Sequence, residues 1–139
     1  MNIALMAHDK KKELMVQFCT AYKSVLAQHH VSATATTGRL VAEATGLPIN
    51  LFMARNQGGP EQILARIAYN EVDMIFFFPD PNTSDPQQDQ CLLDTLRQCD
   101  TYNVPCATNL ASAEMLILGL QRGDLDWREF ARPRRNTFR

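Results

Sequence analysis

The sequence of 139 residues has no long apolar run, no Cys-x-x-Cys pair and almost no net charge. A membrane-spanning helix needs about 20 mostly apolar residues, and no run here approaches that length. The formal net charge of −1 creates no overall field that would attract nucleic acid or an acidic membrane surface. We therefore expect no membrane span and no general affinity for polyanions.

The four cysteines are scattered among apolar or helical residues: Cys19, Cys91, Cys99 and Cys106. Cys91 and Cys99 lie two helical turns apart, farther than a disulfide or a shared metal normally reaches. We expect reduced, buried thiols and no metal, since His29-His30 also lacks ligand partners. No secretory signal is visible, because Asn2–Ala7 is too short and charged residues follow it, so we expect a cytoplasmic protein.

Short apolar runs alternate with longer helical patterns, which is typical of repeated βα units. The pattern predicts one α/β domain, an open twisted, mainly parallel five-stranded sheet with helices on both faces. The expected strands are 2–7, 31–36, 49–53, 74–78 and 104–107. The expected helices are 11–28, 39–45, 61–69, 89–101 and 111–120. The domain is expected to span 1–121, followed by a polar, arginine-rich tail, 122–139.

Ligands of open parallel sheets bind beyond the carboxyl ends of the strands, so the residues that follow each strand are candidate site residues. His8, Asp9 and Lys10–Lys12 follow the first expected strand and combine an imidazole, a carboxylate and ammonium groups. That combination suits proton transfer on an anionic substrate. The alternative is that Asp9 caps a helix and the lysines are solvated.

A threonine-rich turn, Thr34-Ala-Thr36-Thr37-Gly38, follows the second strand. Hydroxyls and backbone N–H groups at the start of a helix form a natural phosphate site, although such strand ends also occur without function. Asp80 follows the apolar strand 74–78 and precedes Pro81. It is either a desolvated base that can also orient a histidine, or a turn residue bonded to its own backbone.

These segments, in this order, resemble the methylglyoxal synthase family from about residue 1 to 118. The same family pattern includes Ala44-Thr45-Gly46, Gly58-Gly59 and Asn103-Val-Pro-Cys-Ala-Thr-Asn109. The resemblance implies a homo-oligomer, typically a hexamer. It also implies conversion of dihydroxyacetone phosphate to methylglyoxal and inorganic phosphate without a metal or organic cofactor.

The resemblance also implies roles for individual residues. His8 would polarise or protonate substrate oxygens, and Asp9 and Asp80 would be supporting carboxylates. The residues expected to bind phosphate are Lys12, Thr34, Thr36, Thr37, Gly38, Gly58 and Gly59.

The sequence departs from the family pattern at the proton-abstracting side of the site. Pro60 stands where the family has its proposed catalytic Asp, and proline cannot accept a proton. Ala54-Arg55 replaces a phosphate-binding Ser-Gly, and Gln87 replaces a histidine. Arg55 either supplies a cationic fork to phosphate or faces solvent or an interface.

Two hypotheses follow. The first is a divergent methylglyoxal synthase in which Glu61 or Asp80 is the base. The second is a catalytically inactive module that binds a phosphorylated metabolite, as the same fold does in the allosteric domain of carbamoyl-phosphate synthetases. The tail mixes cations and aromatics, and we expect an interface or solvated segment rather than a nucleic-acid contact. Its residues of interest are Trp127, Phe130, Arg132, Arg134, Arg135 and Phe138.

Overall fold

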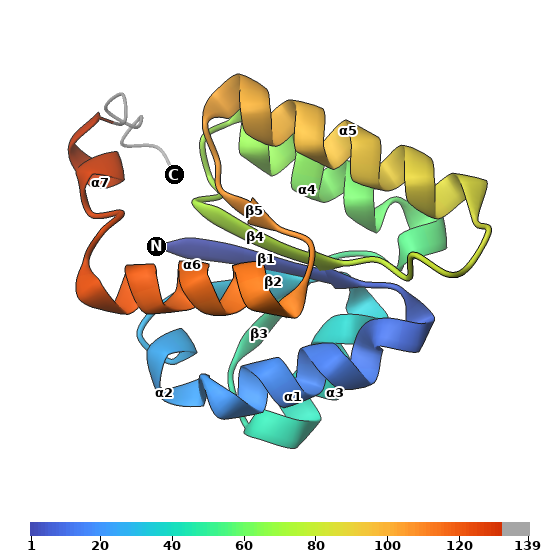
Figure 1. Ribbon diagram of the computed structural model, residues 1–139, viewed down its shortest axis with the longest axis horizontal. Coiled ribbons are helices and arrows are strands. Elements are labelled where there is room, and N and C mark those ends of the chain that lie inside the picture. Colours follow the sequence, from blue (N-terminus) through green and yellow to red (C-terminus); the bar gives the residue numbers. More distant parts are fainter. Residues whose placement is uncertain (132–139) are drawn as a thin grey trace.

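The computed structural model of this chain describes residues 1–131. Its centre is a sheet of five strands, all parallel, in the order β3-β2-β1-β4-β5 (Figure 1). The strands are β1 (Asn2–Ala7), β2 (His30–Ala33), β3 (Ile49–Leu51), β4 (Met74–Phe78) and β5 (Cys106–Ala107). The predicted fold class is therefore confirmed.

Helices cover both faces of the sheet (Figure 1). One face carries α1 (Lys12–Ala21), α2 (Lys23–Leu26), α3 (Ala35–Thr45) and α6 (Leu110–Arg122). The other carries α4 (Gly59–Ala68) and α5 (Pro86–Tyr102). Two 3₁₀ turns, η1 (Asp9–Lys11) and η2 (Arg55–Gln57), precede α1 and α4, and the short helix α7 (Trp127–Ala131) follows α6.

The two cores follow from the alternation of side chains along each strand. Ile3 and Leu5 of β1 pack toward α1 and α6, whereas Ala4 and Met6 pack toward α4 and α5. All five residues of β4 are buried, as its continuous apolar run predicts for a strand covered on both faces. The ring of Phe18 in α1 lies 5.0 Å from that of Phe76, so α1 is held directly on the centre of the sheet.

The start of α3 differs from the prediction. The helix begins at Ala35, four residues earlier than expected, so Thr36, Thr37 and Gly38 lie in its first turns and not in a preceding loop. Close packing explains Gly38, because a Cβ there would lie 2.3 Å from Leu51 Cδ2 and 3.2 Å from Ala33 Cβ. The glycine lets the helix lie close to the sheet.

Two other helices also differ from the prediction. The helix expected over 11–28 is divided at Tyr22, whose φ of −109° and ψ of 25° end α1. Helix α5 begins at Pro86, not at Asp89, because Asp85 caps it: its side chain accepts a hydrogen bond from Gln88 N. The sequence signal was an Asp at the N-cap with proline in the first turn.

The segment after α6 packs on the domain as far as the structure describes it. Arg128 of α7 is 6% exposed and donates a hydrogen bond to the carbonyl of Asn103. Its Nε lies 3.6 Å from Asp73 Oδ1, and Asp73 Oδ2 accepts a hydrogen bond of 2.7 Å from Asn2 N. Arg132, Arg134, Arg135 and Phe138, and the side chain of Phe130, lie outside the described residues.

We predict that Arg128→Ala lowers the free energy of unfolding by about 3 kcal/mol, because it removes a buried cation that faces the buried carboxylate of Asp73. Urea denaturation at neutral pH measures this change. The control is Arg122→Ala, whose ion pair with Asp124 is exposed and should cost no more than about 1 kcal/mol. Equal losses in the two variants would contradict the prediction.

Candidate functional site

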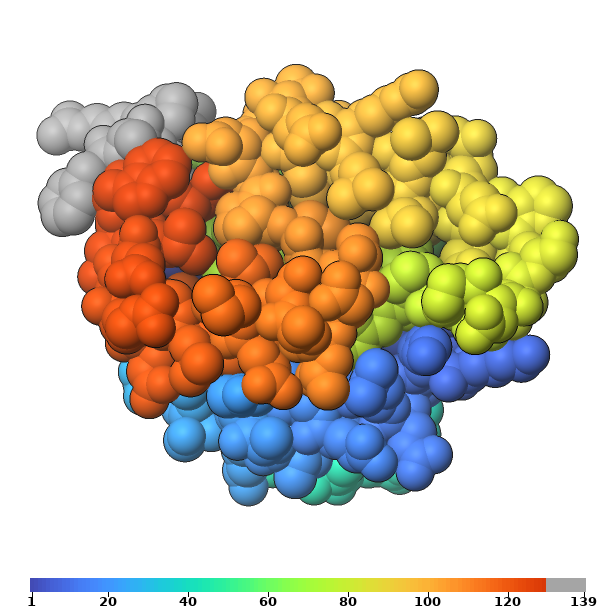
Figure 2. Space-filling model, viewed as in Figure 1, coloured from blue at the N-terminus to red at the C-terminus, as the bar shows by residue number. Residues whose placement is uncertain are grey.

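The strand order defines a switch point between β1 and β4. The chain runs from β1 to β2 and β3 on one side, then crosses to β4 on the other, and such a crevice is where α/β sheets bind ligands. His8 N donates a 2.9 Å hydrogen bond to Phe78 O, which joins the ends of the two strands. Figure 2 shows the loop after β4 against the segment after β1 at the right edge of the molecule.

A small pocket, here called the switch-point pocket, lies at this junction. It brings together residues from the four segments that follow β1, β2, β3 and β4. Three of these residues were predicted from the sequence: His8, Thr34 and Arg55. Its lining comprises Met6, Ala7, His8, Thr34, Arg55, Pro60, Phe77, Gln88 and Cys91. Burial raises the pKa of the Cys91 thiol to about 11, so at neutral pH this thiol is protonated and is no nucleophile.

His8 is buried and has a defined orientation. Its Nδ1 accepts a 3.1 Å hydrogen bond from Lys10 N, which places the proton of the neutral ring on Nε2. Nε2 lies 3.6 Å from Asp85 Oδ2. His8 can therefore donate through Nε2 to an oxygen placed before it, which fits the predicted role of polarising a substrate oxygen.

Asp85 lies beside the switch-point pocket and is not among the residues predicted from the sequence. Its Oδ2 faces two residues of the switch-point pocket, His8 Nε2 at 3.6 Å and Arg55 Nη2 at 3.7 Å. Its Oδ1 accepts a 3.0 Å hydrogen bond from Gln88 N at the start of α5. The capping signature Asp85-Pro86-x-Gln88 could have revealed it, because a cap residue at the end of a βα loop lies at the carboxyl edge of the sheet.

Lys12 and Asp9 form a pair beside the pocket. Lys12 Nζ donates to Ala7 O at 3.0 Å and to Asp9 Oδ1 at 2.8 Å. The Lys12 hydrogen bond and charge lower the pKa of Asp9, whose side chain is 78% exposed. Asp9 does not cap the following turn, since the side chain of His8 does so instead.

Asp80 adopts the turn arrangement. Its carboxylate accepts hydrogen bonds from the Thr83 hydroxyl and from Asn82 N, the second at 3.3 Å. The Thr83 bond is the main cause of a lowered pKa for Asp80. A carboxylate that is bound to its own turn and readily ionised is a poor candidate for the desolvated base, so the structure favours the turn interpretation.

The threonines of α3 differ in their surroundings. Thr34 is the extended N-cap and lines the switch-point pocket, whereas Thr36 is exposed. Thr37 is 1% exposed and its hydroxyl has no hydrogen-bond partner among the described residues. No side chain caps the first turn of α3. Ala35 N donates to Met53 O at 3.4 Å, which leaves the backbone N–H groups of Thr36 and Thr37 for an anion.

The glycine loop before α4 positions Pro60 and directs Glu61 elsewhere. Gly58 is the N-cap, and Gly59 packs so closely that a Cβ would lie 2.0 Å from Met53 O. Glu61 is exposed and lines a neighbouring cavity of about 280 Å³ with Arg55, Gln87 and Asp94, of which His8 is not a part. Its predicted role as base therefore lacks support from the geometry.

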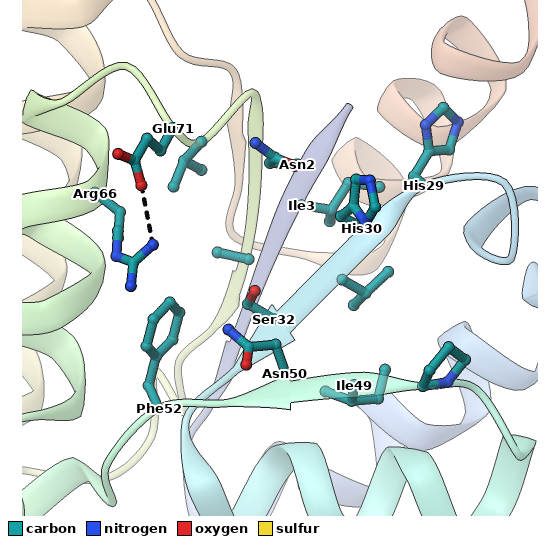
Figure 3. A pocket seen from close by; sticks show the side chains of 14 residues that line it. Asn2, Ile3, His29, His30, Ser32, Ile49, Asn50, Phe52, Arg66 and Glu71 are labelled. Carbon is teal, nitrogen blue, oxygen red and sulfur yellow. Dashed lines mark hydrogen bonds and ion pairs between the residues drawn. The ribbon is translucent and has the colours of Figure 1, made fainter. Parts of the chain in front are cut away.

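A larger cavity, of about 570 Å³, lies on the sheet face beyond α4 and contains none of the predicted site residues (Figure 3). Ser32 and Asn50 are neighbours across β2 and β3 and line it, with Phe52 and the Arg66–Glu71 ion pair of 2.9 Å on the opposite side. A sheet face that helices leave uncovered is expected to carry polar side chains, which explains why Ser32 and Asn50 line this cavity.

Within residues 1–131 there is no group of three His, Cys, Asp or Glu side chains placed to hold a metal ion. No helix in that range is long and apolar enough to cross a membrane.

The fold and the pocket define an open parallel α/β domain with a pocket at its switch point. A family model described as the MGS-like domain matches residues 14–108. Methylglyoxal synthase of Caldicellulosiruptor saccharolyticus is 54% identical over 134 residues, 96% of this chain and 94% of that protein. The enzyme of that name from Geobacillus sp. (strain WCH70) is 50% identical over 138 residues, 99% of this chain and 98% of the relative.

A solved structure agrees with these relatives. The crystal structure of methylglyoxal synthase from Elizabethkingia anophelis NUHP1 superposes with a TM-score of 0.76 and 32% identity, over 84% of this chain and 76% of that one. The chain belongs to the methylglyoxal synthase family.

We predict that Thr83→Val raises the pKa of Asp80 toward its ordinary value of 3.8, because the carboxylate loses its main donor. A carboxyl chemical-shift titration by NMR measures the change. Since the folded pKa of Asp80 is lowered, the Thr83 bond stabilises the fold above pH 3.8 and its contribution is lost as pH falls through the folded pKa. The difference in unfolding midpoint between the wild type and Thr83→Val should therefore shrink as the pH falls. Ser84→Ala, at an exposed position of the same loop, serves as control.

Proposed function

We propose that this chain is a carbon–oxygen lyase that converts dihydroxyacetone phosphate to methylglyoxal and inorganic phosphate in the switch-point pocket. The observation that carries the proposal is the buried His8 at the end of β1, whose Nε2 faces the same Asp85 oxygen as the Arg55 cation. Relatives named methylglyoxal synthase, 50–54% identical across nearly the whole chain, support the same reaction.

In the proposed reaction, a carboxylate takes a proton from the hydroxymethyl carbon and the electron pair of that C–H bond forms an enediolate. The Nε2–H of His8 stabilises the developing negative oxygen. The electron pair then expels phosphate by breaking its C–O bond to carbon, and the hydroxyl proton of the enediolate passes to the departing phosphate. The enolate that remains takes up a proton at carbon and becomes methylglyoxal. The steps balance with no oxidant or reductant.

The phosphate group has several donors near the pocket. Arg55 offers a guanidinium, Thr34 a hydroxyl, and the uncapped first turn of α3 offers backbone N–H groups. The further predicted contacts, including Lys12, are part of this proposal. Assembly into a homo-oligomer stays a prediction that rests on the family resemblance, and a cytoplasmic location stays a prediction that rests on the sequence alone.

A second candidate function is binding of a phosphorylated metabolite without turnover. Pro60 favours it, because the family's base position holds no carboxylate. The binding of Asp80 to its own turn and the absence of His8 from the cavity that Glu61 lines favour it as well. Such a protein would keep the phosphate donors and act as a sensor or regulatory module.

The test is methylglyoxal formation by the purified protein supplied with dihydroxyacetone phosphate. We expect turnover by the wild type and a loss of about 10²–10⁴-fold in His8→Ala, the usual effect of removing a group that handles charge or protons in the transition state. The exposed His30→Ala is the matched control and should be unaffected. A silent wild type whose melting temperature rises with inorganic phosphate would instead support the binding module.

A further inference from the structure

We infer that Asp85 is the carboxylate that takes the substrate proton, in place of the acid that position 60 lacks. The inference rests on the proposed lyase activity and assigns its missing base. It starts from one carboxylate oxygen, Asp85 Oδ2, which both His8 and Arg55 face.

The other candidate carboxylates are engaged or directed elsewhere. Asp9 is exposed and bound to Lys12, and Asp80 is bound to its own turn. Glu61 lines a cavity that does not include His8. Within residues 1–131, Asp85 is the one carboxylate with an oxygen within 4.0 Å of a His8 ring nitrogen.

The two oxygens of Asp85 have different environments. Oδ1 is held by Gln88 N at 3.0 Å, which fixes the carboxylate at the start of α5. Oδ2 lies 3.6 Å from His8 Nε2 and 3.7 Å from Arg55 Nη2, beyond the usual range of a hydrogen bond. This oxygen is therefore positioned by the protein without being saturated by it.

That arrangement places a base beside the reacting carbon. A substrate oxygen that accepts from His8 Nε2–H lies about 2.9 Å from Nε2, and the carbon that loses the proton is at most one further bond from the atom bearing that oxygen. Oδ2 of Asp85, 3.6 Å from the same nitrogen, is thus in the same small volume. Geometry of this kind is the first requirement for a general base.

The proton follows a closed path. The C–H bond breaks and a bond from hydrogen to Oδ2 forms, while His8 donates to the enediolate oxygen and Arg55 faces the phosphate. After phosphate leaves with the C–O electron pair and the hydroxyl proton of the enediolate, the neutral Asp85 carboxyl is positioned to return its proton to the enolate carbon. The base is restored and the atoms of dihydroxyacetone phosphate appear as methylglyoxal and phosphate.

The test is Asp85→Asn, since asparagine caps a helix as well as aspartate does and α5 should keep its start. We expect kcat to fall by about 10²–10⁴-fold, the usual contribution of a general base, with KM and the affinity for inorganic phosphate changed only a few-fold. Exchange of the substrate hydroxymethyl proton with D₂O, followed by NMR, should fall equally. Asp89→Asn, an exposed acid in the same first helical turn, is the matched control.

A double variant separates chemistry from damage to the pocket. Pro60→Asp in the Asp85→Asn background should restore turnover at least ten-fold, because it returns a carboxylate to the family position. If the wild type turns over substrate and Asp85→Asn is equally active, the assignment of the base is wrong and the proposed lyase activity still holds. An inactive wild type would reject the lyase itself, and activity gained there by Pro60→Asp alone would show that Asp85 is no base. Loss of phosphate binding in Asp85→Asn without rescue would make Asp85 a structural residue.

Discussion

The junction of β1 and β4 is the constraint on which the site depends. Both strands are buried on both faces, and the His8 N to Phe78 O hydrogen bond continues their ladder past the end of β1. Packing of Phe18 on Phe76 holds α1 on this pair. Because the strands cannot slide or separate without exposing both cores, the loops that follow them are brought to one place and His8 is held in one orientation.

The sheet itself was predictable from the sequence. The run Met74–Phe78 indicates a buried strand by composition alone, and Gly46 marks the end of α3 as expected. Helix starts were harder, because Gly38 looks like a turn residue until its contact with Leu51 is known. Such a contact joins segments that are distant in the sequence, and local propensity contains no information about it.

The site was predictable in its location but not in its polar contacts. His8, Thr34 and Arg55 follow their strands and therefore meet at one edge of the sheet. Whether a carboxylate faces that edge depends on loop geometry: Thr83 draws Asp80 into a turn, whereas the helix cap directs Asp85 toward His8. Two aspartates in one short loop thus reach opposite roles through neighbouring hydrogen bonds.

The bond from Lys10 N to His8 Nδ1 also limits which molecules the pocket selects. With Nδ1 already accepting from the backbone, the neutral ring offers only a donor to a ligand. A protonated amine, which is itself only a donor, finds no acceptor on this ring, whereas a ketone oxygen or an ionised hydroxyl can accept a hydrogen bond from Nε2–H. The backbone N–H of Lys10 thus makes the pocket favour ligands that accept a hydrogen bond over ligands that only donate one, independently of their charge.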